Sequence, residues 1–455
     1  DREQPSVLAE QLALARVRHG REVGYLTDGF ALKSLTRTML AALRDGTVLA
    51  IDGESHAGAD AAPEQIRFCA TPALAAVAIP DDAEIRWLSA EQSNSSLIVG
   101  DKAVFKLLRR VSAGINPEIE IGERLTRIGY ANAAPLLGHV TRTDAQGGET
   151  TLALLQGFVR NQGDAWRWTL DHLARGAEEY AAAQDEAARD ESVAGYDAFA
   201  EVVGRRLAEL HDVLARPTDA AAFAPQPVDA AAAQRVVAGV EHEVQAMWET
   251  LAAHRDVSED GERAAVDALL AQRPRLDAWL RQAPALLNDA LLTRVHGDFH
   301  LGQILVAFDD VVLIDFEGEP AKSLDERRAK ASPLRDVAGF LRSLDYASEV
   351  SARGEEGTAA RAGVGLDSAL DAFLSAFRRR ASATFLSAYR KVLDASPHPW
   401  VAPAAFEATT LLFLIEKASY EIRYEAANRP AWIMVPIQGL LRILDGFPAP
   451  EESIR

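Results

Sequence analysis

Hydrophobic and polar positions divide the chain into three stretches of different texture. The first, residues 1–86, shows helix-like periodicity over Ser6–Gly20 and short apolar runs at Thr47–Ile51 and Ile66–Thr71, separated by turns rich in Gly and Asp. The periodicity predicts a helix, and the runs predict strands. We expect these residues to form a small appended domain, and no motif in it indicates chemistry.

The stretch from Ile85 to Val159 is rich in strand patterns. One helix interrupts them, beginning near Asn116-Pro117, where proline suits the first helical position. The predicted strands are Ser96–Val99, Ala103–Leu108, Gly138–Thr143 and Thr150–Gly157. Strands on either side of a single helix predict a small α+β lobe.

Beyond Trp166 the pattern is helical almost to the last residue, except for Ala290–Glu319. The Ala- and Pro-containing stretch Pro217–Ala233 predicts a connector between helices. The fold class expected from these textures is α+β. We expect three parts: an amino-terminal domain at residues 1–86, a β-rich lobe at 87–160 and a large, mostly helical lobe at 161–455.

Two apolar runs inside the helical lobe, Ile304–Phe308 and Val311–Ile314, are joined by two aspartates and predict a tight β-hairpin. Such a hairpin brings the loop before its first strand next to Asp315, which follows its second strand. The polar residues Asp298, Gln303 and Asp315 should therefore converge on one spot.

These three residue types suit phosphoryl transfer from ATP. That reaction needs a carboxylate to orient and deprotonate the attacking hydroxyl, oxygen ligands for Mg²⁺ and a cation near the phosphates. Protein kinases place an Asn five residues after the catalytic Asp and a metal-binding Asp after the next strand. Asp298 and Gln303 have that spacing, with Gln in place of Asn. We expect Asp298 to be the catalytic base, and Gln303 and Asp315 to be the metal ligands.

Two other interpretations of the segment stay open. His296, Asp298 and His300 are also typical hydrogen-bonding turn residues, and two histidines with a carboxylate also suit a zinc ion. Neither interpretation accounts for the strand hairpin that ends at Asp315. We expect at least one of the histidines to pack behind the loop and hold Asp298 in place.

The stretch Val295–Ile304 resembles the Brenner-type motif of aminoglycoside phosphotransferases and choline kinases. A longer set of segments is similar to bacterial maltokinases and actinobacterial glucosamine kinases, and it extends roughly over residues 87 to 445. These segments are Glu91–Ser96, Phe105-Lys106, Ser112–Pro117, Ile314–Pro320, Asp325–Arg328 and Ser332–Gly339. The resemblance implies a bilobal protein-kinase-like fold with an amino-terminal cap domain, and ATP and Mg²⁺ as cofactors.

Lys106 ends an apolar strand where a kinase lysine would reach the ATP phosphates, and we expect Glu120 on the following helix to be its ion-pair partner. The loop over the phosphates lacks glycine, so it must use hydroxyls, side-chain amides and backbone N–H groups. Its residues are Gln92, Ser93, Asn94, Ser95 and Ser96. The run Leu154–Phe158, with Gln156 and Phe158, is the expected hinge to adenine.

Near the carboxyl terminus, Lys417, Tyr420, Glu421 and Tyr424 are spaced to share one helical face. Aromatic rings with interleaved acids and bases suit a sugar, which stacks one face and hydrogen-bonds its rim. An amphipathic core helix would give the same pattern. The resemblance implies that this segment binds the sugar, and His300, Arg429 and Trp432 are expected to join it.

Composition narrows the range of partners. The formal charge of −19 argues against nucleic acid and anionic membranes, because both require a basic field. Cys69 is the only cysteine, which excludes an intrachain disulfide. Short apolar runs and an amino terminus without a basic-then-apolar pattern lead us to expect a cytoplasmic protein that binds ATP and a small sugar.

The expected function is a glucosamine kinase that phosphorylates the sugar at O6. Glu421, Glu425 and Asp298 are the carboxylates expected to pair with the ammonium group of the sugar. A maltokinase is the first alternative, although no tryptophan precedes Trp87 and the Arg-Trp-rich cap signature of maltokinases is missing. A non-catalytic pseudokinase and an aminoglycoside phosphotransferase are the remaining alternatives.

Overall fold

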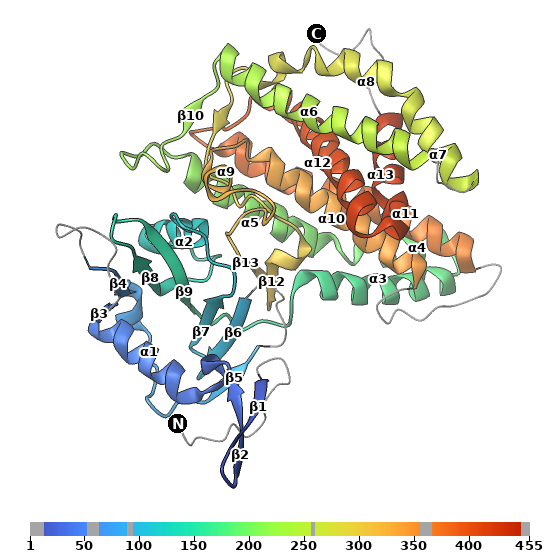
Figure 1. The fold of residues 1–455 in the computed structure, drawn as a ribbon. Coiled ribbons are helices and arrows are strands. Elements are labelled where there is room, and N and C mark those ends of the chain that lie inside the picture. The colour runs from blue at the N-terminus through green and yellow to red at the C-terminus, as the bar shows by residue number, and fades with distance from the viewer. Residues whose placement is uncertain (1–12, 52–62, 89–93, 256–259, 355–365, 447–455) are drawn as a thin grey trace. The chain divides into compact units, whose positions relative to one another are not determined.

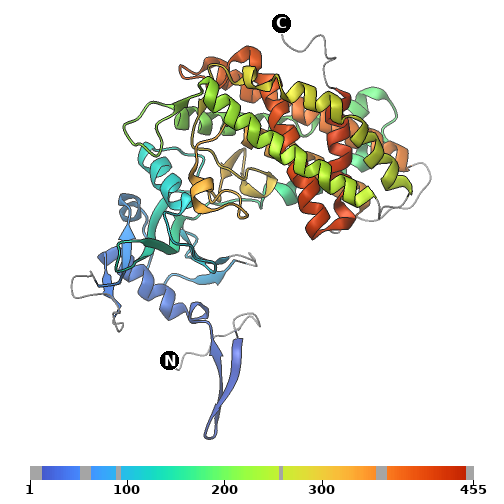
Figure 2. The ribbon, with the colours of Figure 1, turned by 45° about the horizontal axis from the view of Figure 1, so that its top comes forward.

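A computed structural model describes residues 13–51, 63–88, 94–255, 260–354 and 366–446. The chain forms two compact units, divided between Arg160 and Asn161. We describe each unit by itself (Figures 1 and 2).

The first unit is built on one seven-stranded antiparallel sheet, in the order β3-β4-β8-β9-β7-β6-β5. The strands are β3 (Val48–Ala50), β4 (Gln65–Ala70), β5 (Ile85–Trp87), β6 (Asn94–Val99), β7 (Ala103–Leu108), β8 (Leu136–Thr143) and β9 (Glu149–Gly157). Successive side chains of a strand point to opposite faces. Leu155 accordingly packs in one apolar cluster with Leu43 of α1 (Lys33–Asp45), whereas Leu154 packs in a second cluster with Ile119 of α2 (Pro117–Ile128).

The domain boundary expected between residues 86 and 87 is wrong. It falls inside β5, and β3, β4 and β5 share their sheet with the strands of the predicted nucleotide lobe. Sequence texture could not show this, because the pairing of β4 with β8 joins residues that lie about seventy positions apart along the chain. The division at residue 160 coincides with the boundary between the two units.

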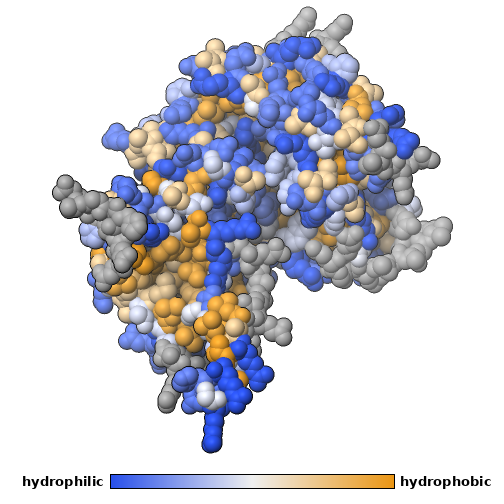
Figure 3. Space-filling view, viewed as in Figure 1, coloured by the Kyte–Doolittle hydropathy of each residue, from blue (hydrophilic) through white to orange (hydrophobic). Residues whose placement is uncertain are grey.

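The helix expected over Ser6–Gly20 is also wrong for its described part. β1 (Ala13–His19) pairs with β2 (Glu22–Thr27) in an antiparallel hairpin, and Gly20 adopts a left-handed conformation at its turn. Residues before Ala13 lie outside the described part of the chain. Leu14, Tyr25 and Leu26 of this hairpin are exposed, and Figure 3 shows apolar surface on the first unit.

The second unit is helical around a small hairpin of β12 (Ile304–Ala307) and β13 (Asp310–Leu313), with a short pair β10 (Gln226–Pro227) and β11 (Leu291–Leu292). Its helices are α3 (Ala165–Ala182), α4 (Glu186–Ala194), α5 (Asp197–Ala215), α6 (Ala230–Arg255), α7 (Asp260–Ala271), α8 (Arg273–Leu280), α9 (Leu324–Arg328), α10 (Leu334–Arg353), α11 (Leu366–Ala395), α12 (Phe406–Asn428) and α13 (Met434–Asp445). Of the helices described, none has the length and apolar character that crossing a membrane requires.

Helix α12 packs against both α6 and α10, and α11 packs along α5 (Figures 1 and 2). Aromatic side chains fill the space between α10 and α11: Phe340 stacks on Phe385 with ring centroids 4.3 Å apart. Such close packing fixes the helices relative to one another. The loop before β12 therefore lies on a rigid helical base.

Candidate active site

The predicted hairpin is present, with its turn at Phe308-Asp309, one residue earlier than expected. Ile304 pairs with Leu313, so Gln303 and Asp315 flank the same end of the hairpin. Gln303 Nε2 donates a hydrogen bond to Asp315 Oδ2 at 3.1 Å. The two predicted metal ligands are thus neighbours in space.

Asp315 has φ of +66°, a left-handed conformation that is uncommon for residues other than glycine. Strained backbone of this kind persists only where the surrounding structure holds it, and it is frequent at active sites. A carboxylate beside a side-chain amide is an oxygen donor set of the kind that Mg²⁺ prefers. The residues present therefore fit the metal that the sequence predicted.

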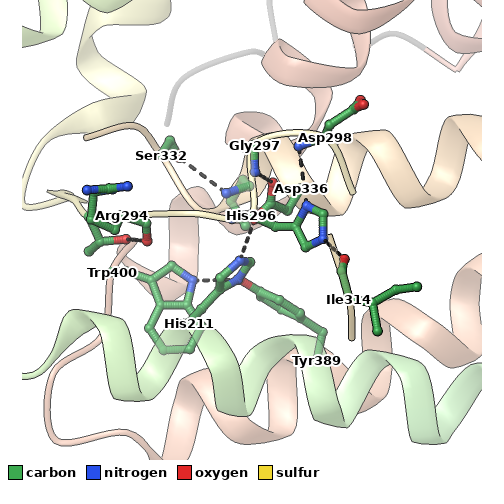
Figure 4. Close-up of polar contacts among 12 residues, drawn as sticks. His211, Arg294, His296, Gly297, Asp298, Ile314, Ser332, Asp336, Tyr389 and Trp400 are labelled. Atoms are coloured by element: carbon green, nitrogen blue, oxygen red, sulfur yellow. Dashed lines mark hydrogen bonds and ion pairs between the residues drawn. The ribbon is translucent and has the colours of Figure 1, made fainter. Parts of the chain in front are cut away.

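His296 links the hairpin to the loop that carries Asp298 (Figure 4). Its Nε2 lies 2.8 Å from the carbonyl oxygen of Ile314, and its Nδ1 accepts from the backbone N–H of Asp298 at 3.4 Å. Both ring nitrogens therefore have partners within the protein. This arrangement matches the expected role of a histidine that holds the loop, and it leaves His296 no lone pair for a zinc ion.

His300 is half-buried at the other end of the loop. Its Nδ1 accepts from the backbone N–H of Gly302 at 3.0 Å, and its Nε2 lies 3.5 Å from Gln303 Nε2. Burial lowers the pKa of His300 despite the opposing charge of Asp298, which favours a neutral ring. The structure therefore places His300 beside the predicted metal ligands and not in the cavity described below.

Asp336, near the start of α10, anchors the loop from below (Figure 4). Its carboxylate accepts from the backbone N–H groups of His296 at 2.8 Å and Gly297 at 2.9 Å, and it lies 3.0 Å from His211 Nε2. Burial alone would raise the pKa of Asp336, but its hydrogen bonds with His211 and with the backbone N–H of Gly297 hold it below its usual value. The carboxylate is therefore ionised and fixes two consecutive loop amides.

The anchor continues through two aromatic residues. His211 Nδ1 lies 2.7 Å from the Tyr389 hydroxyl, which accepts at 2.7 Å from the indole N–H of Trp400. All three side chains are fully buried. Sequence reasoning missed His211 and Asp336, because they lie far apart along the chain and carry no local motif; Asp336 alone was within a segment noted for its resemblance.

A cavity of about 460 Å³ opens beside Asp298 within the second unit. Lys417 and Tyr420 of α12 line it, and Lys417 Nζ is 3.8 Å from Asp298 Oδ1. Burial alone would lower the pKa of Lys417, but Asp298 and nearby glutamates raise it above its usual value. An ammonium ion thus stands next to the predicted base.

Other residues predicted to bind the sugar lie elsewhere. Glu421 is buried against Arg342 of α10, with Oε2 accepting from Nε at 2.7 Å, and Glu425 binds Arg429. The helix turns about 100° per residue, so these two glutamates lie about 100° and 140° around the axis from Tyr420. They face α10, and the expectation that they meet the sugar's ammonium group is wrong.

Tyr424 and Trp432 likewise do not line this cavity. Tyr424 is 44% exposed and stacks on Tyr420 with centroids 6.2 Å apart, and Trp432 lies under the guanidinium groups of Arg353 and Arg429. The structure therefore brings together Asp298, Lys417 and Tyr420 from the predicted set.

In the first unit, Lys106 forms a buried ion pair with Glu118 at 3.1 Å, not with Glu120 as expected. Asn116 caps α2 by accepting from the N–H of Glu118, which places Glu118 in the first turn against the sheet. Gln156 Nε2 donates to the other oxygen of Glu118 at 3.0 Å. Glu118 was overlooked because three glutamates share the start of this helix.

The remaining predicted nucleotide-binding residues are only partly described. Asn94, Ser95 and Ser96 begin β6, where Ser96 pairs with Lys106 across the sheet. Gln92 and Ser93 lie outside the described residues. Phe158 follows β9, and its backbone N–H donates to the carbonyl oxygen of Lys102 at 3.0 Å.

Some known proteins are similar to this chain in sequence. No protein-family model matches the sequence. The chain is 29% identical to a glucosamine kinase of Mycolicibacterium smegmatis over 361 residues, which are 79% of each protein. It is also 29% identical over 278 residues to a glucosamine kinase of Streptacidiphilus jiangxiensis, covering 58% of this chain and 55% of that relative.

A solved structure of glucosamine kinase in complex with glucosamine, ADP and inorganic phosphate shares the fold, with a TM-score of 0.63 and 22% identity over 94% of this chain and 87% of that chain. The chain is similar in sequence to glucosamine kinases and shares the fold of a solved one. The similarity expected from the dispersed motifs is confirmed, and so is the α+β fold class.

Proposed function

We propose that the chain is an ATP-dependent glucosamine kinase, which transfers the γ-phosphoryl group of ATP to a hydroxyl of glucosamine, at O6. The identity with curated glucosamine kinases supports the activity and the sugar. The observation that carries the mechanism is the cavity that opens at Asp298, in the loop that leads on to Gln303 and its hydrogen bond with Asp315.

Asp298 would accept the proton of the attacking hydroxyl while orienting its oxygen. Its backbone is held by the His296 ring and, through the two preceding amides, by Asp336. Lys417 Nζ, 3.8 Å from Asp298 Oδ1, places a positive charge beside the carboxylate. Positioning of this kind supplies much of the catalysis in phosphoryl transfer.

Gln303 and Asp315 would hold Mg²⁺, which neutralises charge on the phosphoryl oxygens when it is bound. Lys106, buried and oriented by Glu118, would contact the phosphates of ATP. The hydrogen bond from Gln156 to Glu118 keeps that glutamate in place. Asn94, Ser95 and Ser96, with Gln92 and Ser93, are proposed to cover the phosphates, and the backbone at Phe158 to meet the adenine.

The first test is ADP release by the purified protein with MgATP and, separately, glucosamine, glucose, maltose and kanamycin. Turnover that favours glucosamine supports the proposal. Turnover with maltose or kanamycin instead would identify a maltokinase or an aminoglycoside phosphotransferase, and the absence of turnover with all four would indicate a pseudokinase.

Asp298→Asn tests the base in the active protein. We expect kcat for glucosamine to fall by about a hundredfold to ten-thousandfold, while the melting temperature stays nearly unchanged, because the side chain keeps its shape and loses only its charge. Activity above about a hundredth of wild type would assign the base to another residue.

A further inference from the structure

Glu319 lines the cavity beside Asp298 although no role has yet been given to it. Its side chain is only 10% exposed. One oxygen, Oε2, pairs with Lys322 Nζ at 2.6 Å. The other oxygen, Oε1, is buried and accepts no hydrogen bond of normal geometry from the described residues, and the Tyr420 hydroxyl lies next to this carboxylate. A buried carboxylate oxygen without a donor is unfavourable, and it indicates a ligand that supplies one.

The other glutamates of the cavity already have partners. Glu416 pairs with Arg335 at 2.8 Å, and Glu243 pairs with Arg423 at 2.5 Å. Glu326 closes the capping box of α9, where one of its oxygens accepts from the backbone N–H and the hydroxyl of Ser323. Among the described glutamates that line this cavity, Glu319 is therefore the one with a buried oxygen that lacks a hydrogen bond of normal geometry.

The carboxylate of Glu319 is ionised and lines the same cavity as Asp298, the proposed base. Burial alone would raise its pKa, but Lys322 and Lys417 hold it below the usual value. Burial, the side-chain contact with Glu319 and the charges of Glu319 and Asp298 raise the pKa of Tyr420. Glu319 and Asp298 line the same cavity as Lys417 and Tyr420.

We propose that the carboxylate of Glu319 binds the ammonium group of the amino sugar, with Oε1 gaining its missing donors. This inference rests on the proposed glucosamine kinase activity. An ammonium group offers three donors and a full positive charge, and it forms the stronger, charge-assisted kind of hydrogen bond. The terminal torsion of a glutamate is broad, so the carboxylate can turn towards the cavity at little cost.

Glu319→Gln keeps the size of the side chain and removes its charge. We expect KM for glucosamine to rise on the order of ten- to a hundredfold with kcat changed little, because a charge-assisted contact present in both ground and transition state is lost. The inhibition constant of glucose, which has a hydroxyl in place of the amine, should change by less than about threefold. Glu319→Asp, which keeps the charge on a shorter arm, should show a smaller loss with the same selectivity.

Glu326→Gln is the matched control. It removes a carboxylate from the same cavity and preserves the capping box, because glutamine also serves at that position. Its KM for glucosamine should equal that of wild type. An equal rise of KM for glucosamine and of the inhibition constant for glucose in Glu319→Gln would mean that Glu319 accepts a hydroxyl, and no rise in either would remove it from the site; both results overturn the inference.

Failure of the inference is separable from failure of the proposed function. Wild-type turnover of glucosamine with an unselective Glu319→Gln variant rejects the inference alone. If wild type does not turn glucosamine over, calorimetric titration of glucosamine and glucose into both proteins decides the matter. Tighter binding of glucosamine to wild type that Glu319→Gln abolishes would support the inference, and equal binding by the two proteins would reject it.

Discussion

Asp298 depends on groups that hold the backbone around it more than on partners of its own side chain. The carboxylate of Asp336 accepts hydrogen bonds from two backbone N–H groups of the loop and contacts His211. Asp336 itself is only 1% exposed. Replacing one buried charged acceptor leaves donors unsatisfied, which is among the more costly changes in a protein. The geometry of the loop that carries Asp298 therefore depends on Asp336 as much as on Asp298 itself.

Asp336→Asn should lower the free energy of unfolding by about 2–4 kcal/mol near neutral pH. The pKa of Asp336 in the folded protein is below its unfolded value, so its contribution is complete above the unfolded pKa of about 4 and is lost as the pH falls through the folded pKa. The difference between wild type and variant should therefore narrow on acidification below about pH 4. Urea unfolding of both proteins across that range measures it, and a difference independent of pH would contradict this account.

Among the elements, α10 supports the site on two sides. Asp336 and Gly339 face the loop that carries Asp298. On the other side of α10, Arg342 donates a hydrogen bond to Glu421 of α12, and Tyr346 donates one to Glu425. Because α12 also carries Lys417, this buried set of charges sets the position of the ammonium beside Asp298.

Gly339→Ala tests the contact between α10 and the loop. A Cβ atom at this position would lie 2.4 Å from the carbonyl oxygen of Phe299, so the backbone next to Asp298 would have to move. We expect kcat to fall at least about tenfold, because small displacements of a catalytic group are costly. Steady-state kinetics of the variant measures the effect.

Gly261→Ala is the control for helix propensity. Gly261 lies in α7, outside the lining of the cavity at Asp298, with nothing within 4 Å of the added carbon, so alanine there should stabilise the protein by up to about 1 kcal/mol and leave kcat unchanged. A kcat for Gly339→Ala equal to that of this control would show that the loop tolerates displacement.

The elements also show what the sequence could predict. Local signals sufficed for the β12–β13 hairpin and for α2, because alternation and the Asn116-Pro117 start depend on neighbours in the chain. They failed for Ser6–Gly20, where a mixed run of apolar residues suggested helical periodicity and the pairing of β1 with β2 instead makes its described part a strand. Local signals also failed for Glu421, because helical spacing does not show which residues of a helix face contact a neighbouring helix.

At the scale of the whole molecule, negative charge dominates. The formal net charge is −19, with 67 acidic and 48 basic side chains. Self-repulsion opposes the compact state and is screened by salt, with a Debye length of about 30 Å at 0.01 M and about 10 Å at 0.1 M. The long-range repulsion should thus be largely removed at ordinary ionic strength.

We expect the melting temperature to rise by a few degrees between about 0.01 M and 0.2 M sodium chloride. Scanning calorimetry without nucleotide or sugar measures it, because ligands would add their own stabilisation. A fall in melting temperature over this range would mean that the ion pairs of the surface outweigh the net repulsion.

The sequence could not predict which strands pair in the sheet or which glutamate Lys106 contacts. The sheet of the first unit joins β3 and β4 to β8, and the ion pair of Lys106 selects Glu118 from several candidate glutamates. The first outcome depends on pairing between strands far apart along the chain, and the second depends on how α2 packs against the sheet. The contact between Gln303 and Asp315 was predictable because the hairpin that brings them together is a local structure.

The series of hydrogen bonds behind the loop that carries Asp298 ends at a chromophore, the indole of Trp400. The indole of Trp400 is fully buried, and its N–H is held by the Tyr389 hydroxyl, which leads through His211 and Asp336 to the loop. Of the seven tryptophans in the sequence, Trp400 thus carries an indole proton that is coupled to the loop's conformation and shielded from solvent exchange. With nitrogen-15 labelling, its resonance gives spectroscopists an intrinsic reporter of loop order that needs no added probe in the substrate cavity.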